Sequence, residues 1–151
     1  MKTQKRFFTA ILVLILLMPT LQTAAKANDM PVTVNINNQP VAFCDQKPVI
    51  IDGRVLVPVS GVFEKLGFEA FWNETAQEIR MEGDFFDIVF RIGRAEYMIF
   101  DDISVTIRRL DTPAKIINGR AMVPLRAAAE AIGGTAEWDA QNMTASIIKL
   151  I

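Results

Sequence analysis

Short apolar segments alternate with turn residues along the chain, a pattern typical of β-strands joined by tight turns. The dipeptides Asp52-Gly53 and Asn118-Gly119 each lie between two apolar segments. They favour two-residue hairpins, in which both central residues need a positive φ. The pattern therefore predicts a strand, a tight turn and a second strand at two places in the sequence.

A short helix is predicted after each of these hairpins. Pro58 and Pro124 follow the second strands, and a proline both ends a strand and suits the first turn of a helix. Apolar residues then recur at helical spacing, and Gly67 and Gly133 stand where a helix ends in a left-handed residue. The apolar residues are Val59, Val62, Phe63 and Leu66 after the first hairpin and Leu125, Ala128, Ala129 and Ile132 after the second. Helices of about two to three turns are expected.

Alternating residues predict more strands after each helix and between the two hairpins. These segments are 68–72, 79–81, 86–92, 97–100, 103–107, 136–138 and 143–147. The predicted fold class is therefore α+β, with a mainly antiparallel sheet and a short helix packed on one face. The last strand runs to the end of the sequence, where we expect it to lie at a sheet edge and to favour a homodimer.

The two hairpin-and-helix segments repeat each other in sequence. Residues 51–72 and 117–138 align without a gap, and nine of the 22 aligned residues are identical. The identical residues include Arg54 and Arg120, and Trp72 and Trp138. Such repetition predicts two tandem repeats of one unit, at residues 28–83 and 84–151.

The repeated string Ile-Asp/Asn-Gly-Arg-x-x-Val-Pro, followed by Glu-x-Leu/Ile-Gly and Ala-x-Trp, resembles the copper amine oxidase N-terminal domain-like family, also called stalk domains. The resemblance implies an accessory extracellular domain, common in exported proteins of Gram-positive bacteria, outside the catalytic domain. The oxidase chemistry of that family's full-length enzymes uses three histidines and a modified tyrosine. This chain has no histidine, and its one tyrosine, Tyr97, lies in Ala-Glu-Tyr-Met rather than the Asn-Tyr-acid setting of the cofactor precursor. We therefore expect no enzyme, no catalytic residue and no cofactor.

The first 27 residues have the pattern of a signal peptide. Basic residues precede an apolar run at 7–18, and Ala25-Lys26-Ala27 supplies the small residues of a cleavage site. An uncleaved membrane anchor is the alternative, but the run is shorter than the roughly 20 residues that span a bilayer. We expect cleavage after Ala27 and an exported protein with no membrane contact, either secreted or associated with the cell wall.

Charge and residue types narrow the chemistry further. Four of the 16 basic residues lie in the signal peptide, which leaves 12 against 17 acidic residues and argues against nucleic acid as a partner. The absence of histidine removes Cys–His and Ser–His–Asp catalysis and the commonest zinc ligand. The one cysteine, Cys44, is expected to be a buried thiol, with an intermolecular disulfide as the alternative. No metal site is expected, because the acids at 82–87 and 101–102 lack the spacing of a calcium loop.

Four residues are candidate contacts with a ligand or partner: Arg54, Arg120, Trp72 and Trp138. The structural interpretation comes first for each. The arginines are expected to cap carbonyls or to pair with Glu64 and Glu130, and the tryptophans to anchor the core. The alternatives are a duplicated ligand contact for the arginines and a stacking platform for a glycan for the tryptophans.

The sequence thus favours a binding or scaffolding module that acts at the cell wall or cell surface. Its partner would be a wall polymer or another extracellular protein. The alternative is a secreted inhibitor or regulator of an extracellular hydrolase, which would use an exposed hairpin such as the one at Asp52-Gly53. An enzyme that uses a pair of carboxylates ranks last, because nothing in the sequence selects a pair.

Overall fold

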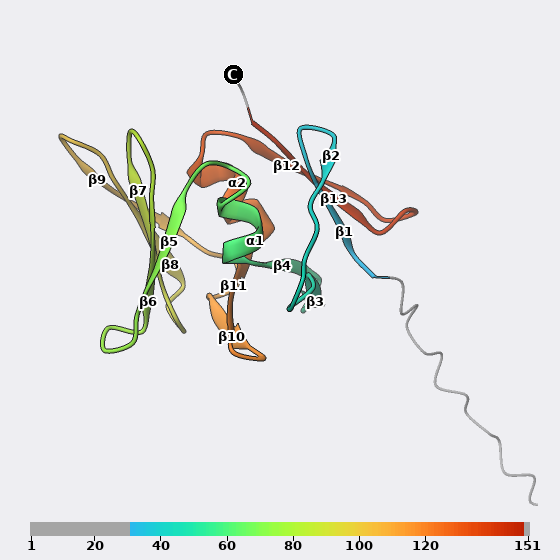
Figure 1. Ribbon diagram of the computed structural model, residues 1–151, viewed down its shortest axis with the longest axis horizontal. Coiled ribbons are helices and arrows are strands. Elements are labelled where there is room, and N and C mark those ends of the chain that lie inside the picture. The colour runs from blue at the N-terminus through green and yellow to red at the C-terminus, as the bar shows by residue number, and fades with distance from the viewer. Residues whose placement is uncertain (1–30, 150–151) are drawn as a thin grey trace, which may run out of the picture.

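Small β-sheets surround two short helices in the computed structural model, which describes residues 31–149 (Figure 1). The predicted signal peptide, residues 1–27, lies outside the described residues. In chain order the elements are β1 (Thr33–Ile36), β2 (Gln39–Pro40), β3 (Val49–Ile51), β4 (Arg54–Pro58), α1 (Val59–Phe63), β5 (Glu69–Asn73), β6 (Glu78–Glu82), β7 (Asp87–Arg91), β8 (Glu96–Phe100), β9 (Val105–Arg109), β10 (Lys115–Ile117), β11 (Arg120–Pro124), α2 (Leu125–Ala131), β12 (Thr135–Asp139) and β13 (Thr144–Ile148). Neither helix of the described residues is long and apolar enough to cross a membrane.

The tight turns predicted from the sequence are confirmed. All four turn residues, Asp52-Gly53 and Asn118-Gly119, have φ between 49° and 76°. They join β3 to β4 and β10 to β11 as antiparallel pairs. A two-residue turn with positive φ at both positions matches the right-handed twist of the strands that it joins.

Both helices are present but shorter than predicted. α1 has five residues and α2 has seven, so α1 makes less than two turns. The difference follows from composition, because α1 contains Gly61, a poor helix former, while α2 contains the run Ala127 to Ala129. The predicted stops hold, since Gly67 and Gly133 adopt φ of 92° and 72°.

A central sheet of order β10-β11-β4-β3 joins the two hairpins. β4 and β11 pair antiparallel, with Val57 opposite Val123, Leu56 opposite Pro124 and Pro58 opposite Met122. β4 begins at residue 54 and β11 at residue 120, an offset of 66 residues. Val57 and Val123 are separated by the same 66 residues, so the register relates the two strands by a local two-fold axis through this buried valine pair.

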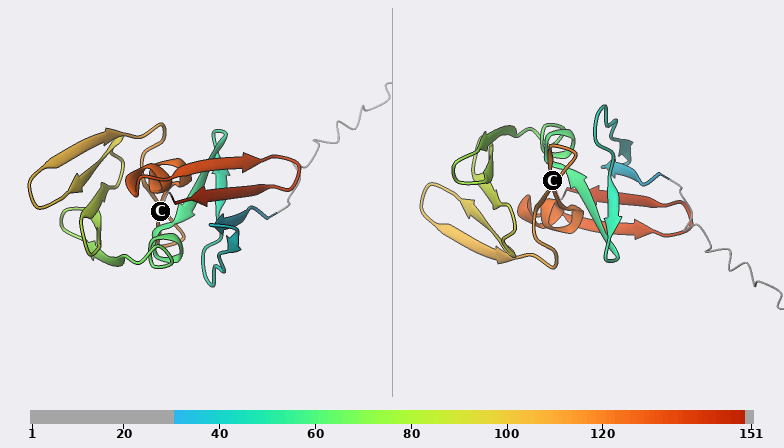
Figure 2. Two further views of the ribbon diagram at one scale, coloured as in Figure 1. Left: turned by 90° about the horizontal axis from the view of Figure 1, so that it is seen from above. Right: turned by 90° about the horizontal axis from the view of Figure 1, so that it is seen from below.

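The other two sheets also combine early and late parts of the chain (Figure 2). The terminal sheet has the order β12-β13-β1-β2, with the first strand parallel to the last. The five-stranded sheet, β5-β6-β7-β8-β9, lies on the other side of the helices (Figure 1). All pairs except β1 with β13 are antiparallel, as predicted for a mainly antiparallel fold. Strand pairs cross the predicted boundary between residues 83 and 84 in all three sheets, so the two halves interlock.

The last strand does not lie at a sheet edge. β13 has β12 on one side and β1 on the other, with Val34 opposite Ala145 and Ile36 opposite Ile147. The edge position predicted from the sequence is therefore wrong, because the first strand of the fold returns to cover it. Dimerisation stays a prediction without this argument.

One hydrophobic core links the three sheets and both helices. Its buried residues come from before and after residue 83 and include Val34, Phe63, Phe90 and Ile147. Phe63, from α1, meets Phe68 and Phe90 edge-on, with ring centroids 5.9 and 6.2 Å apart. Tyr97 stacks on Phe90 with centroids 4.9 Å apart.

Burial of Tyr97 predicts a loss of stability at high pH. Desolvation raises the pKa of Tyr97 from its usual 10 to about 12, the charge of Glu130 adds to this rise, and Arg108 opposes it. Between pH 10 and 12 the unfolded chain has lost the phenol proton while the folded chain keeps it. The free energy of unfolding therefore falls as pH rises, by on the order of 2 kcal/mol from this group. Urea unfolding from pH 9 to 12 measures the loss, and tyrosinate absorbance follows this single tyrosine.

Tyr97→Phe is the matched control for the alkaline prediction. The variant cannot form a phenolate, so its stability should fall less steeply than that of the wild type above pH 10. Parallel stability curves for the two proteins, or a tyrosinate titration centred at the ordinary pKa of about 10, would contradict the prediction.

Candidate functional site

The two repeated arginines form ion pairs, but not with the predicted partners. Arg54 Nε lies 3.2 Å from Asp111 Oδ2, and Arg120 pairs with Asp45. The expected pairing with Glu64 and Glu130 is wrong. Because β4 and β11 run side by side in opposite directions, each hairpin reaches the loop that precedes the other hairpin. Each pair therefore links the two halves of the chain.

The two tryptophans are not core anchors, so the structural interpretation preferred for them is wrong. Trp72 is 45% exposed and Trp138 is 44% exposed. Alternate residues of a strand face the same side, and Ala70 and Ala136, two residues earlier, pack against the core. The tryptophans continue these faces toward the ends of β5 and β12, beyond the cover of the helices.

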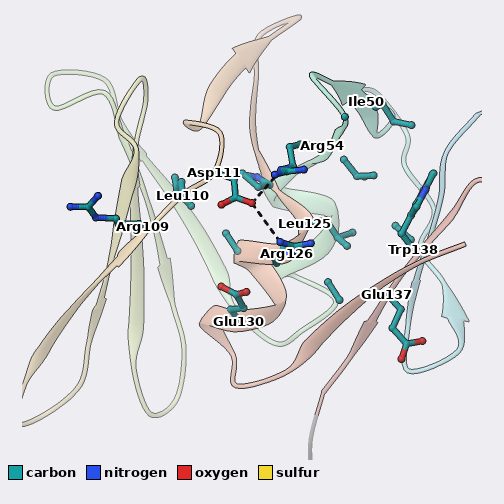
Figure 3. A pocket seen from close by; sticks show the side chains of 16 residues that line it. Ile50, Arg54, Arg109, Leu110, Asp111, Leu125, Arg126, Glu130, Glu137 and Trp138 are labelled. Carbon is teal, nitrogen blue, oxygen red and sulfur yellow. Dashed lines mark ion pairs between the residues drawn. The ribbon is translucent and has the colours of Figure 1, made fainter. Parts of the chain in front are cut away.

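Trp138 and Arg54 line the same open groove, which we call the α2 groove (Figure 3). The groove has a volume of about 440 Å³, within the usual range of small-ligand sites. Four segments form it: the β3–β4 hairpin, the connection from β9 to β10, helix α2, and the β12–β13 hairpin. The lining residues are Ile50, Gly53, Arg54, Val55, Arg109, Leu110, Asp111, Pro124, Leu125, Arg126, Ala127, Glu130, Ala136, Glu137, Trp138 and Ala145.

The polar end of the α2 groove is a carboxylate between two guanidinium groups. Asp111 Oδ2 lies 3.2 Å from Arg54 Nε and 3.5 Å from Arg126 Nη1, so both arginines meet the same oxygen (Figure 3). The three side chains are each between 47% and 64% exposed. With all three ionised, the cluster carries one net positive charge and faces solvent.

The opposite end of the groove is apolar and aromatic. Ile50, 43% exposed, lies near Trp138 on the side of the groove away from Asp111 (Figure 3). Two acids, Glu130 on α2 and Glu137 on β12, lie along the lower edge in the same view. The guanidinium of Arg109 points away from the groove, toward the five-stranded sheet.

A smaller groove of about 320 Å³ lies beside α1, and we call it the α1 groove. Several of its residues stand 66 positions before residues of the α2 groove, but its contents differ. The ring of Phe43 covers Gly61 so closely that a Cβ on Gly61 would lie 2.8 Å from two ring atoms. The corresponding residues of the α2 groove are Arg109 and Ala127. Ser60 likewise stands where the α2 groove has Arg126.

Cys44 is exposed and lines the α1 groove. The prediction of a buried thiol is therefore wrong. The residue lies in the irregular segment between β2 and β3, outside any strand that would turn its side chain into the core.

The acids weighed as calcium ligands include one that shapes a turn. The Asp101 carboxylate accepts hydrogen bonds from the Ile103 and Ser104 backbones and the Ser104 hydroxyl. These bonds, that from Ile103 first, hold the pKa of Asp101 below its usual value. Asp139 has the same role before β13, where bonds from Asn142 and Gln141 lower its pKa. Between residues 31 and 149, no three His, Cys, Asp or Glu side chains are placed to hold a metal ion.

Sequence reasoning missed three residues of the α2 groove: Asp111, Arg126 and Ile50. The repeat held a signal for the first, because Asp45 and Asp111 are separated by the same 66 residues as Arg54 and Arg120. Arg126 had no such signal, since Ser60 replaces it in the other half. Trp138 and Arg54 were predicted as candidates, and the structure brings these two into one groove.

Comparison with known proteins identifies the family. A family model for the copper amine oxidase N-terminal domain matches residues 35–147. No curated protein and no solved structure matches the chain. The matched region runs from β1 to β13 and so includes both hairpins, both helices and the α2 groove. The chain belongs to the copper amine oxidase N-terminal domain family.

Proposed function

We propose that this protein is a non-enzymatic binding module that acts outside the cell membrane, at the cell wall or cell surface. Export through the signal peptide at residues 1–27 is part of the proposal. The family match is to the N-terminal domain rather than to a catalytic domain, which supports a binding role. We also propose that the module consists of two copies of one unit. Nine identical residues among 22, and strands of equal length at an offset of 66, support the duplication.

The α2 groove is the observation that carries the proposed binding function. It presents an exposed indole, an exposed isoleucine and two guanidinium groups, all of which suit recognition of a polymer. Its lining residues include no Ser, Thr, Cys, Lys, Tyr or His that would act as a nucleophile beside a base. Its Asp111 carboxylate is held by two arginines. These groups fit binding better than covalent catalysis.

Replacement of Trp138 should weaken binding to the cell wall. Trp138→Ala removes the aromatic surface of the groove, and truncation of a central interface tryptophan costs about 2 kcal/mol or more, which is over tenfold in affinity. The measurement is co-sedimentation of residues 28–151 with purified peptidoglycan sacculi over a range of protein concentrations. Saturable binding by the wild type and at least tenfold weaker binding by the variant are the expected results.

Trp72→Ala is the matched control for Trp138→Ala. Trp72 has the same exposure and the same place in its strand, but it does not line the α2 groove. Its replacement should leave binding within about twofold of the wild type. Equal losses in the two variants would exclude the α2 groove as the binding site. A folded wild-type protein that does not bind sacculi would refute the wall-binding proposal.

A further inference from the structure

We infer that the α2 groove recognises a carboxylate group of its ligand between Arg54 and Arg126, while a ring or apolar part of the same ligand lies against Trp138. The inference rests on the proposed binding function and adds the chemical class of the ligand. It follows from the charges, the free donors and the asymmetry of the two grooves.

The arginines have donors to spare. A guanidinium group carries five N–H donors, and here Arg54 and Arg126 both direct their ion-pair contact to one oxygen of Asp111. The side chains are 47% and 64% exposed, so their remaining donors are open to a ligand. A second carboxylate would neutralise the single positive charge of the cluster. Arginine suits this role because its planar fork matches the two oxygens of a carboxylate.

The charges along the groove fix the direction of the ligand. Glu130 lies one helical turn beyond Arg126 on α2, and Glu137 lies beside Trp138 on β12. Both repel a carboxylate, so a ligand carboxylate is favoured only at the arginine end (Figure 3). The apolar surface of Trp138 and Ile50 remains for a sugar ring or an aliphatic chain at the other end.

The α1 groove lacks each of these features, although it lies at the corresponding place in the other half. It has one arginine, Arg120, whose partner is Asp45, and Ser60 where the α2 groove has its second arginine. Phe43 covers Gly61 and occupies space that stays open beside α2. The chain therefore carries one carboxylate site.

The ligand class is a carboxylate attached to a ring or an aliphatic chain within a wall polymer. Two sources in peptidoglycan have this chemistry: the carboxylates of its stem peptides, and the sugar-borne lactyl carboxylates that become free when an amidase removes those peptides. Both present a planar anion next to an apolar surface. The experiment below distinguishes them.

The test compares native sacculi with sacculi whose carboxyl groups have been converted to methylamides, both freed of phosphate-containing polymers. Loss of a hydrogen-bonded charge pair costs about tenfold to a hundredfold in affinity, and we expect that loss on conversion. Soluble glycan strands released by an amidase, measured beside the released peptides, identify the source. Retained affinity for only the strands assigns the carboxylate to the sugar, and for only the peptides to the stem.

Variants link the carboxylate effect to the two arginines. Arg126→Ser, which copies Ser60, and Arg54→Ala should each weaken binding to native sacculi about tenfold or more and remove the difference between native and converted sacculi. Arg126→Lys keeps the charge without the fork and should retain part of the affinity. Arg120→Ala, which removes the matching ion pair outside the α2 groove, should bind like the wild type.

The outcomes separate this inference from the proposed function. Equal binding to native and converted sacculi, with Trp138→Ala still defective, would overturn carboxylate recognition and leave the wall-binding function standing. No binding of either preparation by the folded wild type would overturn both. Equal defects in Arg120→Ala and Arg126→Ser would also overturn the inference, because a general loss of positive charge would then explain the effect.

Discussion

Produced separately, residues 28–83 and residues 84–151 will each lack a cooperative unfolding transition. Separation removes the pairs of β1 with β13, β4 with β11, and β6 with β7, and it divides the core. The first half keeps isolated two-stranded hairpins, which are at best marginally stable in water. Far-ultraviolet circular dichroism and thermal melting of each half measure the result. Mixed in equal amounts, the halves should form a 1:1 complex with restored strand signal.

A protein cut after folding is the control for the separated halves. The loop around Phe85, which is 85% exposed, is accessible to a protease, and a single cut there breaks no strand pair. The two fragments should then stay together in gel filtration and melt as one unit. Separate halves that each melt cooperatively would show that the strand pairs across residues 83 and 84 are not required for folding.

The Phe63→Ala variant should be about 3 to 5 kcal/mol less stable than the wild type. The ring is fully buried and meets two other phenylalanines edge-on, so its removal leaves a cavity that the neighbouring sheets fill poorly. A domain of this size has a total stability of only about 5 to 15 kcal/mol, so the variant loses much of it. Urea unfolding, extrapolated to water, measures the difference.

Phe85→Ala is the matched control, because it makes the same chemical change at a residue that is 85% exposed. Its free energy of unfolding should stay within about 0.5 kcal/mol of the wild type. A loss below about 1 kcal/mol for Phe63→Ala would mean that the core closes around the missing ring, contrary to the packing seen at α1.

The sequence alone determined the local structure of this protein. Both tight turns, the glycines that end the helices and most strands were predictable, because φ preferences and residue alternation act between neighbours in the chain. The repeat also marked Arg54 and Trp138, which both line the α2 groove. These features depend on a few consecutive residues or on a fixed offset, and both can be read without knowing how distant segments meet.

Only the tertiary structure decided how the two halves combine. The pairing of β4 with β11 brings Arg54 to Asp111, and the parallel pairing of β1 with β13 turns the predicted edge strand into an inner one. Contacts across more than 50 residues depend on which surfaces bury the most apolar area together, and local pattern does not encode that choice. The exposure of both tryptophans has the same cause. The helices cover only part of each sheet face, and the uncovered part holds the α2 groove.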